Sequence, residues 1–392
     1  MTYSSCSLGS VAFALRPLHV NLGGVLAPDE VVGRQREVDE IVKAIDGPGA
    51  LLTGDRRMGK TSVIRAVEAR ARAEGYAVVR ISAERASLEE FVDALAQSLT
   101  SLGTKFRREV ERWRLTAHAG PITAQRIPAP RSLDDLIGRT VNAASPRPLV
   151  LMIDEVPVMA KTLEGQKPGA GGEFLHLMRR LRQDYDRLRM VLSGSIGFHH
   201  VTGEAPGTVN DVQRVPIGPL EEEDAIYLAR CLLLGERVVT TSERAVAEAI
   251  ASAAENVPYY EHHLVNAANQ AAAARGHGVG PDEIAGLVDA ALFDPDDPWD
   301  LRHYRDRLRD YYGPQTRLAA TVLDVCAKTH DALSVDDILV RLAFVDELPP
   351  VPRDELTLLL ERLEADHYLV RRGNGDLFPR NLVRRAWLAF RR

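Results

Sequence analysis

The amino-acid sequence predicts an α/β protein with a doubly wound parallel sheet, followed by a helical region and a small C-terminal domain. Three observations predict this fold. A glycine-containing loop lies between a short apolar strand and a helix in residues 50–73. Strand and helix patterns then alternate as far as Ile217, which is the order that right-handed βαβ crossovers produce. After Leu220 the strand signal stops, and Ala-rich amphipathic helix patterns follow.

The strands and helices of the α/β region follow from local patterns. The strand at 148–154 is apolar without alternation, which is typical of a strand buried on both faces of a parallel sheet. Ser87 and Ser132 each precede an acid by three residues, as the first residue of a capping box does. The other strands are predicted at 50–53, 76–82, 189–193 and 212–217, and the helices at 34–45, 61–73, 87–100, 132–144 and 173–185.

The remainder of the chain predicts two further domains. Helices at 241–254 and 264–274 indicate a helical lid, and the Pro- and Asp-rich residues 294–298 are typical of a linker. Beyond them, three helices precede two short strands joined by Gly373-Asn374-Gly375, whose residues tolerate the positive φ of a hairpin turn. This order predicts a winged-helix domain. The predicted division is an N-terminal extension at 1–30, an α/β core at 31–219, a lid at 220–296 and a winged helix at 297–392.

Composition and charge limit the classes of function. The 392 residues are 45% hydrophobic and 27% charged, which is typical of globular domains. The net charge of -6 provides no overall attraction to nucleic acid or to an anionic membrane. Cys6, Cys231 and Cys326 lie far apart, so neither a zinc site nor a disulfide framework is predicted. No apolar run approaches the roughly 20 residues that span a bilayer, and we expect a cytoplasmic protein without membrane contact.

The loop after the first strand has the pattern of a phosphate-binding loop, G-x-x-x-x-G-K-[ST]. Its backbone N–H groups and the start of the following helix attract phosphate oxygens. We expect Lys60 to reach the β- and γ-phosphates of a nucleoside triphosphate and Thr61 to bind Mg²⁺ through its hydroxyl. ATP with Mg²⁺ is therefore the predicted cofactor. The predicted nucleotide-binding residues of the loop are Gly54, Asp55, Arg56, Arg57, Met58, Gly59, Lys60, Thr61 and Ser62.

Two carboxylates end the apolar strand at 148–154, and strand ends of this kind form the ligand sites of α/β sheets. We expect Asp154 to hold the hydration shell of Mg²⁺ and Glu155 to act as the general base on the attacking water. Ser193 and Ser195 end the next strand. They are candidates for sensing the γ-phosphate or orienting the water, although an ordinary turn that caps a strand explains them as well.

In chain order, these motifs resemble those of the AAA+/STAND-type P-loop ATPases, and most of all the prokaryotic archaeal-type ATPase group with a C-terminal winged helix. The segments that carry the resemblance are VGRQREVDEI, GDRRMGKTS, LVLMIDEV, LSGSIGF, PIGPL and NVPYYEHHL. The resemblance implies ATP hydrolysis and a lid over the nucleotide. It also implies that Ser193 and Ser195 occupy the sensor-1 region, and that the residues contacting the base include Val32, Gly33, Arg34 and, in the lid, Pro258.

ATPases of this kind use a trans-acting arginine, and no motif here identifies it. Arg214 at the fifth strand is the best-placed candidate, with Arg179 and Arg180 as alternatives, although exposed arginines without such a role are common. Because such an arginine is worth about 10³–10⁵ in rate, hydrolysis is expected to be slow until a partner supplies one.

The first hypothesis is a nucleotide-dependent molecular switch that hydrolyses ATP and signals through its winged helix to a protein partner or a second copy. The alternative is a DNA-binding ATPase of the loader, transposition or transcription-regulator type. It is not favoured, because the helix at 353–366 that would enter the major groove carries more acids than bases. The basic residues that could contact phosphates lie near the C-terminus: Arg371, Arg372, Arg380, Arg384, Arg385, Arg391 and Arg392.

Overall fold

The computed structural model describes residues 14–118, 129–194, 197, 200, 207–346 and 348–391. The chain forms two compact units. The smaller unit joins the described residues up to Gly24 to Leu220–Ala290, and the larger unit comprises Val25–Pro219 and Ala291–Arg392. In the ranges just given, no helix is both long and apolar enough to cross a membrane.

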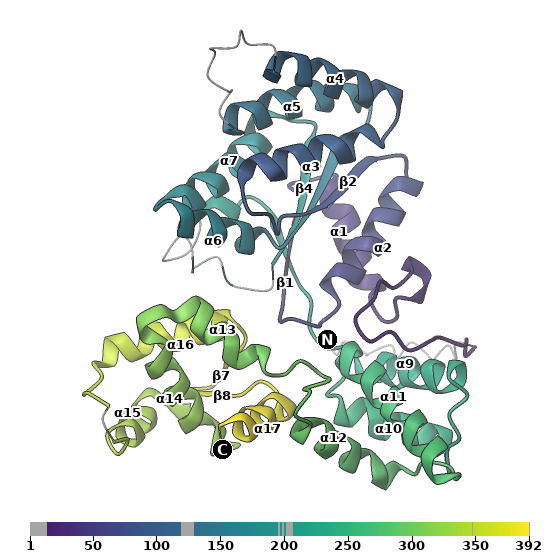
Figure 1. Ribbon diagram of the computed structural model, residues 1–392, viewed down its shortest axis with the longest axis vertical. Helices are drawn as coiled ribbons and strands as arrows, with labels where there is room; N and C mark the ends of the chain where they lie inside the picture. Colours follow the sequence, from purple (N-terminus) through teal and green to yellow (C-terminus); the bar gives the residue numbers. More distant parts are fainter. Residues whose placement is uncertain are drawn as a thin grey trace, which may run out of the picture. The chain divides into compact units, whose positions relative to one another are not determined.

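A five-stranded parallel sheet forms the centre of the larger unit (Figure 1). The strand order is β2-β3-β4-β1-β5, and all four pairings are parallel, which confirms the predicted doubly wound sheet. β3 is buried over nearly its whole length between two neighbours, and this explains its continuous apolar sequence. The strands are β1 (Ala50–Thr53), β2 (Ala77–Ser82), β3 (Leu149–Asp154), β4 (Leu188–Ser193) and β5 (Gln213–Pro216).

Helices pack on both faces of this sheet, because successive side chains of a strand point to opposite faces. α1 and α2 contact the strands on one face, and α3 to α7 share a core with residues such as Leu151 and Met190 on the other. The sequence analysis does not predict α4, because charged residues outnumber its apolar ones. Its buried apolar residues are Phe106, Val110 and Trp113. The helices are α1 (Gln35–Ile45), α2 (Lys60–Ala73), α3 (Leu88–Thr100), α4 (Thr104–His118), α5 (Ala129–Ala143), α6 (Val156–Gln166) and α7 (Ala170–Asp184).

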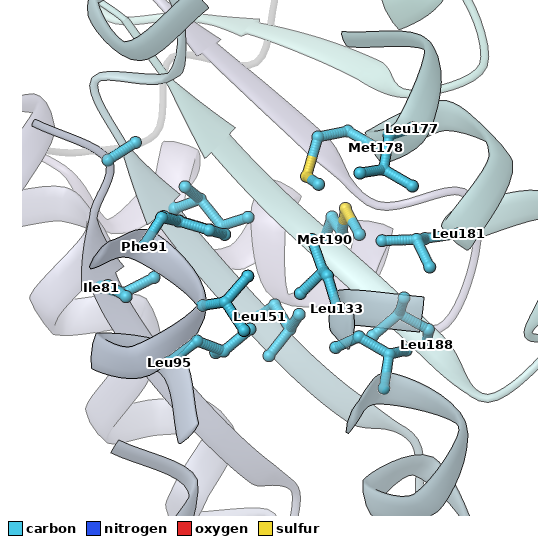
Figure 2. Close-up of a cluster of buried hydrophobic side chains, with 14 of the residues drawn as sticks. Ile81, Phe91, Leu95, Leu133, Leu151, Leu177, Met178, Leu181, Leu188 and Met190 are labelled. Carbon is cyan, nitrogen blue, oxygen red and sulfur yellow. The ribbon is translucent and has the colours of Figure 1, made fainter. Parts of the chain in front are cut away.

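Figure 2 shows part of the core between the sheet and α3, α5 and α7. Leucines and methionines from the three helices meet Leu151, Leu188 and Met190 of the strands. Phe91 of α3 packs edge-to-face on Phe174 of α7, with ring centroids 6.0 Å apart. This geometry is favourable for two rings, and it locks the two helices together over the sheet.

The C-terminal part of the larger unit has a three-stranded antiparallel sheet in the order β6-β8-β7. Gly373 turns the β7–β8 hairpin at a φ of 61°. The elements occur in the order that the winged-helix prediction requires, with the short β6 added; the winged-helix assignment itself stays a prediction. The elements are α13 (His303–Tyr312), α14 (Thr316–Ala327), β6 (Leu333–Ser334), α15 (Val335–Leu342), α16 (Arg353–Ala365), β7 (Val370–Arg372), β8 (Gly375–Leu377) and α17 (Asn381–Phe390).

The smaller unit is helical, as the sequence of 220–296 predicts, and it includes part of the segment that was expected to be an extension. Leu18 donates its backbone N–H to the Cys231 carbonyl at 3.0 Å. Gly235 lies against the same segment, and a Cβ there would meet the Leu18 carbonyl oxygen at 1.9 Å, so only glycine fits. The helices of this region are α9 (Glu222–Gly235), α10 (Glu243–Ala253), α11 (Pro258–Arg275) and α12 (Ile284–Phe293).

Replacing Phe174 by alanine is expected to lower the free energy of unfolding of the α/β core by about 3–5 kcal/mol, because it empties a fully buried ring position. Urea denaturation measures the loss. Phe344→Ala is the control, since Phe344 is 84% exposed and its removal is expected to cost no more than about 0.5 kcal/mol. Equal effects of the two substitutions would contradict this description of the core.

Candidate functional site

The loop between β1 and α2 has the backbone that a phosphate-binding loop requires. Gly54 has a φ of 145° and Gly59 a φ of 88°, in regions that L-residues avoid. A Cβ on Gly54 would lie 2.1 Å from the Ile217 carbonyl oxygen, so glycine alone allows the loop to pass this close to the end of β5. The loop then enters α2 at Lys60, where the first N–H groups of the helix are not used within it.

Lys60 is buried at the centre of this loop, with 6% of its surface exposed. Its amine donates to the carbonyl oxygens of Gly54 and Asp55, both at 2.8 Å. Burial lowers the pKa of Lys60 below its ordinary value, although the nearby carboxylates of Glu155 and Asp55 oppose this effect. A cation held by two loop carbonyls can exchange them for phosphate oxygens without leaving the loop.

Two predicted site residues, Thr61 and Ser193, contact the carboxylate of a third, Asp154. Asp154 accepts a hydrogen bond from the Thr61 hydroxyl at 3.1 Å and another from the Ser193 hydroxyl. The sheet order explains the meeting, because β4 lies between β3 and β1 and all three strands end at the same edge. These oxygens are the hard donors that Mg²⁺ prefers, so the residues fit the predicted ion.

Glu155 follows Asp154 in the left-handed backbone region, with a φ of 57°. This conformation is rare for a residue with a side chain and costs about 1 kcal/mol or more. It directs the chain from β3 straight into α6, so that Glu155 lies next to Asp154 at the edge of the sheet where the phosphate loop begins. The position therefore suits the predicted general base.

Arg34 has a different environment from that expected of an adenine contact. It is 4% exposed, and its guanidinium donates to the Met58 carbonyl at 3.0 Å and to the Gly218 carbonyl at 2.5 Å. It also pairs with Glu37 at 2.9 Å. We therefore infer that Arg34 braces the loop against the end of β5. Val32 and Gly33 lie immediately before it and stay the predicted adenine contacts.

The other predicted residues are dispersed. Arg214 lies exposed on the edge strand β5, whereas Arg179 donates to the Gly207 carbonyl and Arg180 pairs with Asp184. Pro258 begins α11 in the smaller unit. Ser195 lies outside the described residues. Of the remaining predicted loop residues, Met58 is buried, whereas Arg56, Arg57 and Ser62 are partly or fully exposed.

The residue with the most unexpected surroundings is Asp55, which is only 3% exposed. Its carboxylate accepts hydrogen bonds from the Tyr304 hydroxyl and the Arg380 guanidinium, and an Arg307 nitrogen lies 3.7 Å away. Burial on its own raises the pKa of Asp55, but Arg380, Arg307 and Tyr304 hold it below its ordinary value. Asp55 occupies a variable position of the loop motif, so no local signal identifies its partners.

Further contacts join the same parts of the larger unit. Arg57 pairs with Asp300, and the Lys161 amine lies 3.5 Å from the centroid of the Tyr311 ring. Asp366 accepts hydrogen bonds from His200 and, at 2.8 Å, from Tyr312. The C-terminal segment therefore packs on the loop and on the residues that follow β3 and β4.

Comparisons with known proteins agree with this geometry. Residues 30–167 match the family model described as the AAA ATPase domain. This part of the chain is an AAA ATPase domain. The match confirms the resemblance to AAA+ P-loop ATPases and the expected ATP hydrolysis. A search of curated protein sequences returned no match.

Solved structures show that the likeness in fold extends beyond the AAA ATPase domain. A Walker-type ATPase of Pyrococcus abyssi has 17% identity and a TM-score of 0.63, over 94% of this chain and 99% of that one. The ORC2 protein of Aeropyrum pernix, in complexes with ADPNP and ADP, has 12% identity and a TM-score of 0.57, over 93% and 96%. At these identities the likeness is one of fold alone.

Replacing Glu155 by glutamine is expected to lower kcat of the AAA ATPase about 10²–10⁴-fold, because the amide cannot take a proton from the attacking water. Phosphate release measures the rate, and equilibrium binding of a fluorescent ATP analogue is expected to change little. Glu173→Gln is the control, since Glu173 is exposed on α7. A fall in rate of less than tenfold for Glu155→Gln would contradict the assignment of the base.

Proposed function

We propose that this protein is a Mg²⁺-dependent ATPase that works as a molecular switch, and that Asp55 couples its nucleotide loop to the C-terminal domain at 297–392. The observation that supports the coupling is the set of partners around Asp55. The carboxylate belongs to the phosphate loop, whereas Tyr304, Arg307 and Arg380 belong to the C-terminal domain.

The chemistry follows from the residues around the loop. Lys60 and the loop N–H groups hold the phosphates, and Thr61 and Asp154 hold the metal. Mg²⁺ supplies neutralisation of the charge that develops on the phosphate oxygens. Glu155 takes the proton of the attacking water, and Ser193 keeps the Asp154 carboxylate in place through its hydrogen bond. The products are ADP and inorganic phosphate.

The path from phosphate to domain runs through Lys60 and Asp55. Binding of phosphate draws the Lys60 amine away from the Asp55 carbonyl, which it contacts at 2.8 Å. The phosphate charge also repels the Asp55 carboxylate, more strongly in ATP than in ADP. Both effects loosen the contacts that Asp55 makes with Tyr304 and Arg380.

The free energy of these contacts is of the order that a two-state switch requires. Changing a two-state population from 1:99 to 99:1 takes about 5.5 kcal/mol of differential binding. Hydrogen bonds to charged groups contribute about 1.5–3 kcal/mol each. Two such bonds, from Tyr304 and Arg380, therefore supply a difference of the required order.

The alternative, DNA binding through the arginine-rich C-terminus, has less support. Arg371 pairs with Glu364 and Arg391 with Asp324. Arg384 donates to the Ala327 carbonyl, and Arg380 is buried against Asp55. These arginines hold the domain together and dock it on the loop. We propose instead that the domain contacts a protein partner or a second copy, with Arg214 as the candidate trans-acting arginine.

Hydrogen exchange tests the switch directly. Exchange in residues 300–312 is expected to be faster with Mg²⁺ and a non-hydrolysable ATP analogue than with Mg²⁺ and ADP. The control is Lys60→Ala, which is expected to lose nucleotide binding and any difference between the two nucleotides. Equal exchange rates with both nucleotides bound would contradict the coupling. That result would not contradict ATP hydrolysis, which phosphate release measures separately.

A further inference from the structure

Away from the nucleotide loop, a charged surface lies between α4 and α5, where the two helices pack side by side (Figure 1). They form an open groove of about 630 Å³. Among the described residues that line it, basic side chains outnumber acidic ones, and the only aliphatic side chain is that of Ala143. The lining side chains that concern binding are Lys105, Arg108, Arg112, Arg139, Asn142 and Tyr185.

The four cations of the groove are of two kinds. Arg112 is held by Glu109 at 2.9 Å, and Arg139 by both oxygens of Asp135 at 2.9 Å. Lys105 and Arg108 are exposed and make no ion pair with any residue that the structure describes. The groove therefore has four basic side chains and two acidic ones, Glu109 and Asp135. Its net charge is positive.

The groove lies at the opposite edge of the sheet from the nucleotide loop. α5 ends at Ala143, just before β3 begins at Leu149, and Tyr185 precedes the start of β4 at Leu188. The phosphate loop and Asp154 lie where the parallel strands end. A ligand in the groove therefore does not compete with ATP.

We propose that this groove binds the sugar–phosphate backbone of a nucleic acid. Lys105, Arg108 and Arg112 are three and four residues apart, so they lie on one face of α4 within about 10 Å, at 1.5 Å per residue. Such a row suits consecutive phosphates. An acidic peptide would offer apolar side chains, and the groove has little apolar surface to receive them.

The contact is independent of base sequence. The groove has a single aromatic side chain, and the Tyr185 hydroxyl is held by Asp134 at 3.2 Å. Backbone contacts position a protein on nucleic acid without reading its bases. This inference does not depend on the proposed switch, because the groove and the nucleotide loop share no residue.

The test is fluorescence anisotropy of the full chain with a labelled DNA duplex of mixed sequence, over a series of salt concentrations. The variant Lys105→Gln/Arg108→Gln is expected to bind at least tenfold more weakly at low salt and to lower the slope of log K against log salt by about two. The control is Arg107→Gln/Arg114→Gln, which removes the same charge from the opposite face of α4. This control is expected to lose less than threefold.

Three results would overturn the proposal. They are no binding of the duplex by the unchanged protein at low salt, equal losses in the two variants, and displacement of the duplex by polyglutamate at lower charge concentration than by unlabelled DNA. Binding of a fluorescent ATP analogue is expected to be the same in both variants, so a failure of the groove is distinguished from a failure of the nucleotide site.

Discussion

The buried carboxylate of Asp55 is the constraint on which the proposed coupling depends. A phosphate loop works by positive potential, and a negative charge buried within it is costly unless partners compensate it. Arg380, Arg307 and Tyr304 provide that compensation from a segment about 250 to 325 residues away in the chain. Removing one partner of a buried pair typically costs about 3–5 kcal/mol. Loop and C-terminal domain therefore cannot separate without changing the charge balance of the nucleotide site.

The loop is held on its other sides by contacts that leave it little freedom. Gly54 lies against the end of β5, and Arg34 joins the loop to Gly218. Lys60 fills the interior through two carbonyl contacts. Because these contacts hold the loop elsewhere, the proposed change in Lys60 on phosphate binding acts mainly on Asp55, whose carbonyl Lys60 contacts. In the proposed switch, Lys60 and Asp55 are therefore the route from the phosphates to the C-terminal domain.

The sequence was informative where the signal is local. The phosphate loop, the apolar β3 with Asp154 and the five strands all have patterns that a short window contains, and the sheet order then brings Thr61, Asp154 and Ser193 together. α4 was missed because its apolar residues are outnumbered by charged ones. The partners of Asp55 and the bracing role of Arg34 depend on tertiary contacts, and no short window of sequence contains them.

The most direct test of the central claim is the dissociation constant of Mg²⁺-ATP in a double-mutant cycle of Asp55→Asn and Arg380→Gln. If ATP binding loosens the contact between Asp55 and Arg380, replacing Arg380 removes a contact that the nucleotide has to weaken, and it does so only while the Asp55 carboxylate is present. We expect Arg380→Gln alone to strengthen binding about tenfold, or about 1.4 kcal/mol. Combined with Asp55→Asn it is expected to change binding less than twofold. The same factor in both backgrounds would contradict the claim.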